Sequence, residues 1–142
     1  MPAWLLFSFG SAVFAALVAI FAKIGLGNVN TTLATTIRSL MMSGILLIAG
    51  FAFGTFRNVK WGNITGREWV YLFLAGLAGA LSWLCYFIAL KSGSAVKVSA
   101  IDRMSLVLVV VLAALFLGES LTWKTVVGAL IMVVGAVLVT IK

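Results

Sequence analysis

The chain has 142 residues, of which 64% are hydrophobic and only 9% are charged, and its mean hydropathy is +1.27. A soluble domain has roughly 45–50% apolar residues, so this composition excludes a water-soluble globular domain. The absence of His and the single Cys exclude His-based acid–base chemistry, His/Cys zinc sites and an internal disulfide framework. The net charge of +7 lies in short segments between apolar runs. Such charges are typical of membrane-protein loops that face anionic headgroups, not of a nucleic-acid-binding patch.

The apolar runs predict an all-α membrane protein with five transmembrane helices. Roughly 20 helical residues cross a hydrocarbon core about 30 Å thick. Five runs have about that length, and they cover residues 4–26, 32–56, 69–90, 95–117 and 121–141. The first run is too long for the apolar part of a signal peptide and lacks a basic segment before it, so we expect a mature helix. Together the five runs predict a single transmembrane domain over residues 1–142.

Small residues recur at helical spacing in three of these runs and predict close helix contacts. Lipid provides no hydrophobic drive for helix association, so backbones approach one another where side chains are small. The ridges are Ser8/Ala12/Ala16 and Ser11/Ala15/Ala19 in the first run, Ala75/Gly76/Gly79 in the third, and Gly128/Gly135 in the fifth. Two interpretations remain open, which are packing within one bundle and contact between two copies of the chain.

The basic residues between the runs do not define one orientation in the membrane. Five crossings place the two termini on opposite sides. One side then carries Lys23, Lys91, Lys97 and Lys142, and the other carries Arg57, Lys60, Arg67 and Lys124. This balance gives no firm orientation under the positive-inside rule. It fits either a weak bias or a dual topology, in which copies insert both ways and pair antiparallel like the inverted repeats of many transporters.

Three ionisable residues lie well inside the predicted spans. Asp102 is the only acid there, about seven residues from the start of the fourth run and roughly 10 Å deep. Arg38 lies at a similar depth in the second run, so an Asp102–Arg38 contact is geometrically possible, whereas Arg103 points about 100° away from Asp102 around the helix. One interpretation is structural, with an ion pair or with Arg38, Lys97 and Arg103 snorkelling to the headgroups. The other is a solute-contacting or coupling site, such as a proton site in exchange.

Trp83 and Tyr86 lie deep in the third run, with Cys85 between them. Trp83 is expected either to line a cavity and stack on solutes or cations, or to pack in the core. Cys85 is expected to be an inert, buried small residue, and Glu119 to cap the last helix. The remaining tryptophans lie near span ends, where they are expected to be interfacial anchors: Trp4, Trp61, Trp69 and Trp123. With no Gly-rich phosphate cradle, metal quartet or nucleophile triad, we expect neither a metal nor a cofactor.

Three motifs carry a family resemblance. ALSWLCYFIALKSG, at residues 80–93, is similar to the end of the third helix of the EamA domain in the drug/metabolite transporter superfamily. IDRMS, at residues 101–105, looks like the IDKLS variant of the short bacterial and archaeal branch. LFLGESLTW, at residues 115–123, resembles the turn that joins the last two helices of that domain. Since most members carry two such domains, inverted, in one chain, the resemblance implies a five-helix half-transporter.

The resemblance therefore implies a secondary transporter, an exporter or exchanger of small metabolites or related solutes, that acts as an antiparallel homodimer by alternating access. Its setting would be the cytoplasmic (inner) membrane of a prokaryote, and its partners would be lipid, a small solute and a second copy, with no nucleic acid. The candidate solute-binding or coupling residues are Asp102, Arg38, Arg103, Trp83 and Tyr86. The alternative is a membrane scaffold or accessory subunit. An intramembrane enzyme is disfavoured, because one acid and no His leave too few catalytic groups.

Overall fold

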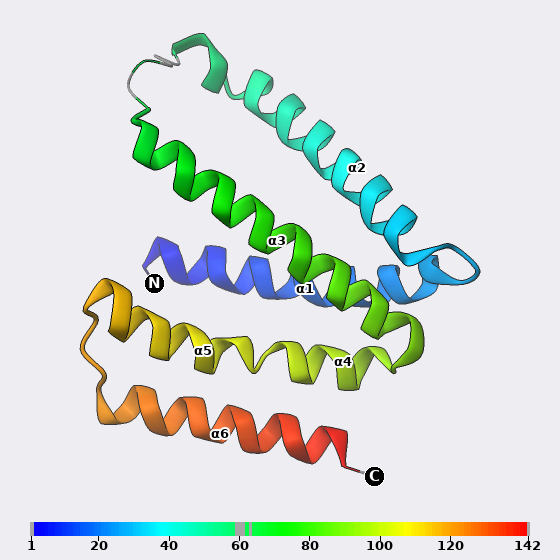
Figure 1. The fold of residues 1–142 in the computed structure, drawn as a ribbon, viewed down its shortest axis with the longest axis vertical. Helices are drawn as coiled ribbons and strands as arrows, with labels where there is room; N and C mark the ends of the chain where they lie inside the picture. Colours follow the sequence, from blue (N-terminus) through cyan, green and yellow to red (C-terminus); the bar gives the residue numbers. More distant parts are fainter. Residues whose placement is uncertain (1, 59–61, 63, 142) are drawn as a thin grey trace. The chain divides into compact units, whose positions relative to one another are not determined.

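A computed structural model describes residues 2–58, 62 and 64–141, and in these residues the regular structure is entirely helical. The α-helices in chain order are α1 (Ala3–Leu26), α2 (Thr31–Ala52), α3 (Gly66–Ser92), α4 (Ala95–Asp102), α5 (Ser105–Leu112) and α6 (Trp123–Thr140) (Figure 1). A 3₁₀ turn covers Thr55–Asn58, and a π-helical turn covers Ala113–Leu117. Two of the loop charges, Lys60 and Lys142, and the predicted anchor Trp61 lie outside the described residues.

The predicted all-α membrane fold with five spans is confirmed. Within the described ranges, the helices that are long and apolar enough to cross a membrane are Ala3–Leu26, Thr31–Ala52, Gly66–Ser92, Ala95–Leu117 and Trp123–Thr140. The second span ends before residue 56, because Gly54 adopts a left-handed φ of 67° and turns the chain. The ring of Phe56 then lies against Gly50, where a Cβ atom would clash with it.

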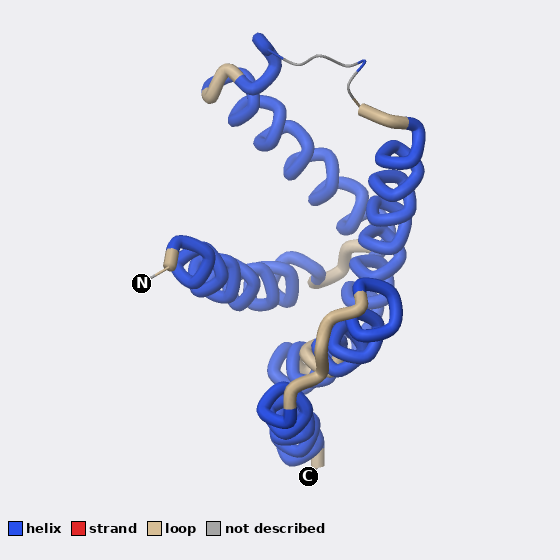
Figure 2. The backbone as a smooth tube through the Cα atoms, turned by 90° about the vertical axis from the view of Figure 1, so that its left-hand side faces the viewer, coloured by secondary structure: helices blue, strands red, loops and turns tan. Residues whose placement is uncertain are grey.

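The helices form two compact units, which are described separately. The terminal unit holds residues 1–23 and 92–142, and the hairpin unit holds Ile24–Lys91. In the terminal unit, α6 packs along α4 and α5, and both views show these helices side by side (Figures 1 and 2). In the hairpin unit, α2 and α3 run in opposite directions (Figure 1).

Lysine ammonium groups bind backbone carbonyls in the terminal unit. Lys97 Nζ donates to the carbonyl of Thr140, in the last turn of α6, at 2.8 Å. Lys23 Nζ donates to the carbonyl of Gly93 at 2.7 Å. A cation at a helix C-terminus satisfies unpaired carbonyls and favours the negative end of the helix dipole. Lys97 therefore has a structural bond in place of free snorkelling to the headgroups.

The fourth span is interrupted in its first half. α4 ends at Asp102 and α5 begins at Ser105. Between them, the amide of Met104 donates to the carbonyl of Ile101 at 2.9 Å, a bond from residue i to i−3 that tightens the helix into a 3₁₀ turn. The sequence pattern does not indicate this break, because an apolar run with normal helix formers surrounds it. The break leaves Asp102 and Arg103 at a junction between two short helices.

The connection into α6 corrects the expected cap. The π-helical turn ends at Gly118, which has a left-handed φ of 67°. The residue that caps α6 is Thr122, whose hydroxyl accepts a hydrogen bond from the amide of Thr125 at 3.3 Å. The prediction that Glu119 caps this helix is wrong, because an N-cap side chain reaches amides two or three residues ahead. Glu119 lies too early in the turn to reach them.

The two helices of the hairpin unit begin at well-formed caps. The side chain of Asn30 accepts from the amides of Thr32 and Leu33 and begins α2. At the start of α3, Glu68 accepts from the Thr65 amide at 2.7 Å, and the Glu68 amide donates to the Thr65 hydroxyl at 3.4 Å. This reciprocal pattern is a capping box. The carboxylate of Glu68 is thereby committed to the loop that precedes α3.

Candidate functional site

An arginine of α2 stacks on an aromatic cluster of α3 in the hairpin unit. The Cζ atom of Arg38 lies 3.6 Å from the ring centroid of Trp83 and 6.0 Å from that of Phe87. Tyr86 and Phe87 both meet the Trp83 ring edge-on, at centroid distances of 5.5 and 6.1 Å. Phe87 is buried, with only 3% of its surface exposed. The indole is therefore held by its neighbours, and it presents one face to the guanidinium.

This arginine–aromatic cluster lies well inside the two membrane-spanning helices, away from their ends. Arg38 is about seven residues from the beginning of α2, which places it roughly 10 Å along the helix axis. Trp83 is about nine residues from the end of α3, or roughly 14 Å. α2 begins and α3 ends on the same side of the membrane, so the two depths agree.

The guanidinium of Arg38 keeps one unused donor. Its Nη1 atom is buried and has no hydrogen-bond partner among the described residues. Neighbouring hydroxyls are engaged within α2, because Thr35 donates to the Thr31 carbonyl and Ser39 donates to the Thr35 carbonyl, each at 2.8 Å. The hairpin unit contains one acid, Glu68, at the opposite end of α3 from this cluster. No carboxylate within the unit therefore neutralises Arg38.

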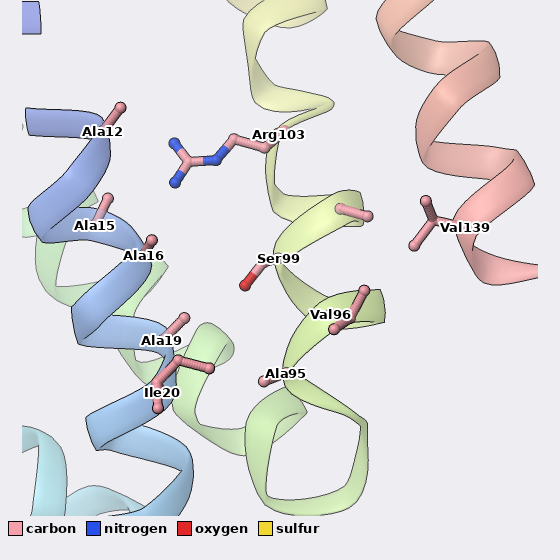
Figure 3. Close-up of a pocket in the computed structure, with 11 residues that line it drawn as sticks. Ala12, Ala15, Ala16, Ala19, Ile20, Ala95, Val96, Ser99, Arg103 and Val139 are labelled. Carbon is pink, nitrogen blue, oxygen red and sulfur yellow. The ribbon is translucent and has the colours of Figure 1, made fainter. Parts of the chain in front are cut away.

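A second feature is a groove in the terminal unit, between α1 and α4 (Figure 3). It has a volume of about 620 Å³, and its walls are mostly apolar. The α1 wall is formed by the predicted small-residue ridges, with Ala12, Ala15, Ala16 and Ala19. Ser99 and Arg103 supply its polar groups, and Figure 3 shows the Arg103 side chain extending from its helix toward the α1 side. The ridges thus border a groove within one chain.

The five candidate residues are divided between the two units. Arg38, Trp83 and Tyr86 come together in the hairpin unit, whereas Asp102 and Arg103 lie in the terminal unit, where both are exposed. The Asp102–Arg38 contact therefore stays a prediction.

The structure adds Phe87 and Ser99 to the residues around these sites. Phe87 follows Trp83 by four positions, and this spacing places both on one helix face, so periodicity alone could have indicated it.

Other predictions about single residues have mixed outcomes. The prediction that Cys85 is buried is wrong, because this residue lies on the helix surface away from the side of α3 that holds Phe87 and Leu90, and it is exposed. The described terminal tryptophans are exposed near the helix ends, with 67% for Trp4, 52% for Trp69 and 79% for Trp123, as lipid-facing anchors would be. Among the described residues, no three Cys, Asp or Glu side chains come close enough together to bind a metal ion.

Five spanning helices with charged side chains held inside the spans define a multi-pass membrane protein. The chain matches the EamA-like transporter family over residues 2–141 and belongs to that family. This confirms the resemblance drawn from the three motifs.

Two bacterial relatives are both named as transporters. An uncharacterized transporter encoded in the cobO 3′ region of a Sinorhizobium species is 40% identical, over 97% of this chain and 96% of its own length. The uncharacterized transporter YvbV of Bacillus subtilis strain 168 is 31% identical, over 96% of this chain but only 44% of its own length. No solved structure matches the chain.

Proposed function

We propose that this protein is a secondary transporter, and not an enzyme, that exports or exchanges small metabolites or related solutes. It works in the cytoplasmic membrane of a prokaryote, as an antiparallel homodimer with alternating access. Family membership and the names of the two bacterial relatives support transport as the activity. The bacterial origin of these relatives supports the inner membrane as the location.

The observation that carries the dimer is a difference in length between the relatives. The chain matches the Sinorhizobium protein almost from end to end, yet it covers only 44% of the Bacillus protein. The longer protein has room for two such units, and inverted repeats within one chain are a common basis of transporters. A five-span chain can build the same arrangement by pairing two copies in opposite orientations. Its balanced loop charges favour neither orientation.

The five candidate residues would line the pathway in this arrangement. Asp102 and Arg103 are exposed at a helix break roughly 10 Å inside the span. A charge at that depth needs a water-filled cavity or a protein partner, and interrupted helices commonly form the binding sites of transporters. The domain over residues 1–142 would supply half of the cavity, with Arg38, Trp83 and Tyr86 as its second cluster. The other copy would supply the rest.

Topology mapping tests the antiparallel dimer. Cys85 is replaced by Ala, and a cysteine is introduced at Asn28, an exposed position in the loop between α1 and α2. An impermeant maleimide is then applied to right-side-out and to inverted vesicles. We expect about half of the molecules to be labelled from each face, because balanced loop charges give no preferred orientation. Labelling from one face alone would reject dual topology.

A complementation assay then tests function. Two variants are made, each with lysines added to the loops of one side, so that each inserts in a single orientation. Each is reconstituted alone and together, and uptake of labelled amino acids, sugars, amines and carboxylates is compared with that of empty liposomes. We expect uptake only from the mixture. Equal uptake by either variant alone would reject the antiparallel dimer, and no uptake from any sample would favour a scaffold role.

A further inference from the structure

We propose that the arginine–aromatic cluster of the hairpin unit, Arg38 with Trp83, Tyr86 and Phe87, is the solute site, and that the solute it takes is an organic monocarboxylate. This rests on the proposed transport function and adds the chemical class of the solute. Three properties of the cluster support it, which are its unused donor, its charge and its aromatic walls.

The unused N–H donor of Arg38 favours a solute that carries a hydrogen-bond acceptor. Arg38 Nη1 is buried and has no partner among the described residues, so it is a donor that a ligand could satisfy. The Cζ atom of Arg38 lies over the indole ring, and a guanidinium group presents N–H donors in a planar fork. That geometry matches the two oxygens of a carboxylate, which accept from both arms of the fork. The hydroxyls of Thr35 and Ser39, on the same helix, already donate to carbonyls of α2, so their protons are not available to a bound anion.

The charge of the site selects for a single negative charge. The hairpin unit contains one acid, and Glu68 is committed to the capping box at the far end of α3. Within the hairpin unit, Arg38 thus carries a positive charge inside a span that no carboxylate of this unit neutralises. A monoanion would neutralise it, whereas a dianion would leave one excess negative charge in a medium of low polarity. A neutral or cationic solute would leave the guanidinium unpaired.

The walls of the site favour an apolar body on the anion. The rings of Trp83 and Phe87 lie beside the guanidinium, Tyr86 packs edge-on against the Trp83 ring, and Leu90, one turn further along α3, is fully buried. Small apolar groups gain from contact with such surfaces. A short fatty acid anion such as butanoate combines one carboxylate with a small apolar tail. It is the simplest probe of this chemistry.

Binding is measured directly, without transport. A variant retains Trp83 as its sole tryptophan, with phenylalanine at the other four positions, which are Trp4, Trp61, Trp69 and Trp123. The protein is placed in nanodiscs of phosphatidylcholine, and Trp83 fluorescence is titrated with butanoate, butanamide and sulfate. We expect a saturable change with butanoate, a response at least tenfold weaker with sulfate, and none with butanamide. Equal responses to butanoate and butanamide would overturn the proposal.

Matched variants identify the group that binds. Arg38→Gln should abolish the butanoate response, and Arg38→Lys, which keeps the charge but loses the planar fork, should weaken it at least tenfold. Lys124→Gln, at an exposed lysine in the first turn of α6 that belongs to neither site, should leave it unchanged. A butanoate response that survives Arg38→Gln would overturn the proposal. If Arg38→Gln does not elute as a single species, the Arg38→Lys result alone decides, with unweakened binding counting against the carboxylate fork.

Two further experiments test whether another group, and not a solute, neutralises the charge of Arg38. If Asp102 neutralises Arg38 within the protein, butanoate would bind only after Asp102→Asn, and the proposal would be wrong. If an anionic lipid is the occupant, replacing a third of the lipid with phosphatidylglycerol would abolish the butanoate response, which would also overturn it. We expect binding in both lipid mixtures and in both forms of residue 102. Binding without uptake in proteoliposomes would contradict the transporter alone, whereas uptake of solutes without carboxylate preference would contradict only the site.

Discussion

The two arginines inside the spans stand in different surroundings. Arg38 lies against the face of Trp83, with a buried Nη1 atom that lacks a partner among the described residues. Arg103 is exposed at the break between α4 and α5 and extends into a groove lined by alanines (Figure 3). The first has aromatic rings beside its guanidinium, and the second borders a groove with mostly apolar walls. Depth in the membrane alone therefore does not decide what an intramembrane charge does, because its immediate neighbours set both its orientation and its desolvation.

The largest expected effect is a difference in solute uptake between variants of these two arginines. Arg38→Gln should reduce uptake of radiolabelled butanoate into proteoliposomes by at least about 30-fold, because truncating a buried, hydrogen-bonded charge pair costs roughly 2–5 kcal/mol. Arg103→Gln should reduce it by less than about fivefold, because contacts of an exposed charge contribute roughly 0.2–1 kcal/mol. Equal losses in the two variants would erase the distinction. A larger loss for Arg103→Gln would make the alanine-lined groove the main site.

A smaller effect is expected when the groove is filled. Ala16→Leu places three more carbons between α1 and α4, and we expect uptake to fall by about tenfold, which is the lower end of the roughly 1–3 kcal/mol that a single extra methylene in a pocket is worth. The matched control is Val13→Leu, on the same helix at a residue that is 60% exposed and does not line the groove. Unchanged uptake in Ala16→Leu would show that the groove takes no part in solute movement, and only the hairpin cluster would remain.

The smallest expected effect is on stability, when a lysine–carbonyl hydrogen bond within either unit is removed. Lys97 donates to the Thr140 carbonyl in a partly buried bond, whereas Lys91 of the hairpin unit donates to the Val29 carbonyl at 2.9 Å in an exposed one. Lys97→Met should lower the free energy of unfolding in detergent by about 1 kcal/mol, and Lys91→Met by less than about 0.5 kcal/mol. Thermal unfolding of the purified variants, followed by circular dichroism, measures both changes. Equal destabilisation would show that burial does not distinguish the two bonds.

Several features of the site follow from the sequence in physical terms. The apolar runs predict five spans, because a helix needs a fixed number of residues to cross the hydrocarbon core. Position within a span then gives depth, so the order of residues is enough to recognise Arg38, Asp102 and Arg103 as charges inside the membrane. The order of residues does not predict which side chains these charges contact. The contact between Arg38 and Trp83, for example, depends on how α2 and α3 are rotated about their axes. No periodicity within either helix fixes that rotation.

Composition and short motifs are enough to predict the class of this protein, its five crossings and its family, because each of these depends on features that are local in the chain. Three features are visible only in the folded chain: Arg38 stacks on Trp83, the ridges of α1 border a groove, and the fourth span breaks after Asp102. These features depend on distances between atoms of different helices, or on a change from α to 3₁₀ hydrogen bonding that normal helix formers do not signal. A charge in the membrane is thus visible in the sequence, but its partner is visible only once the helices are packed.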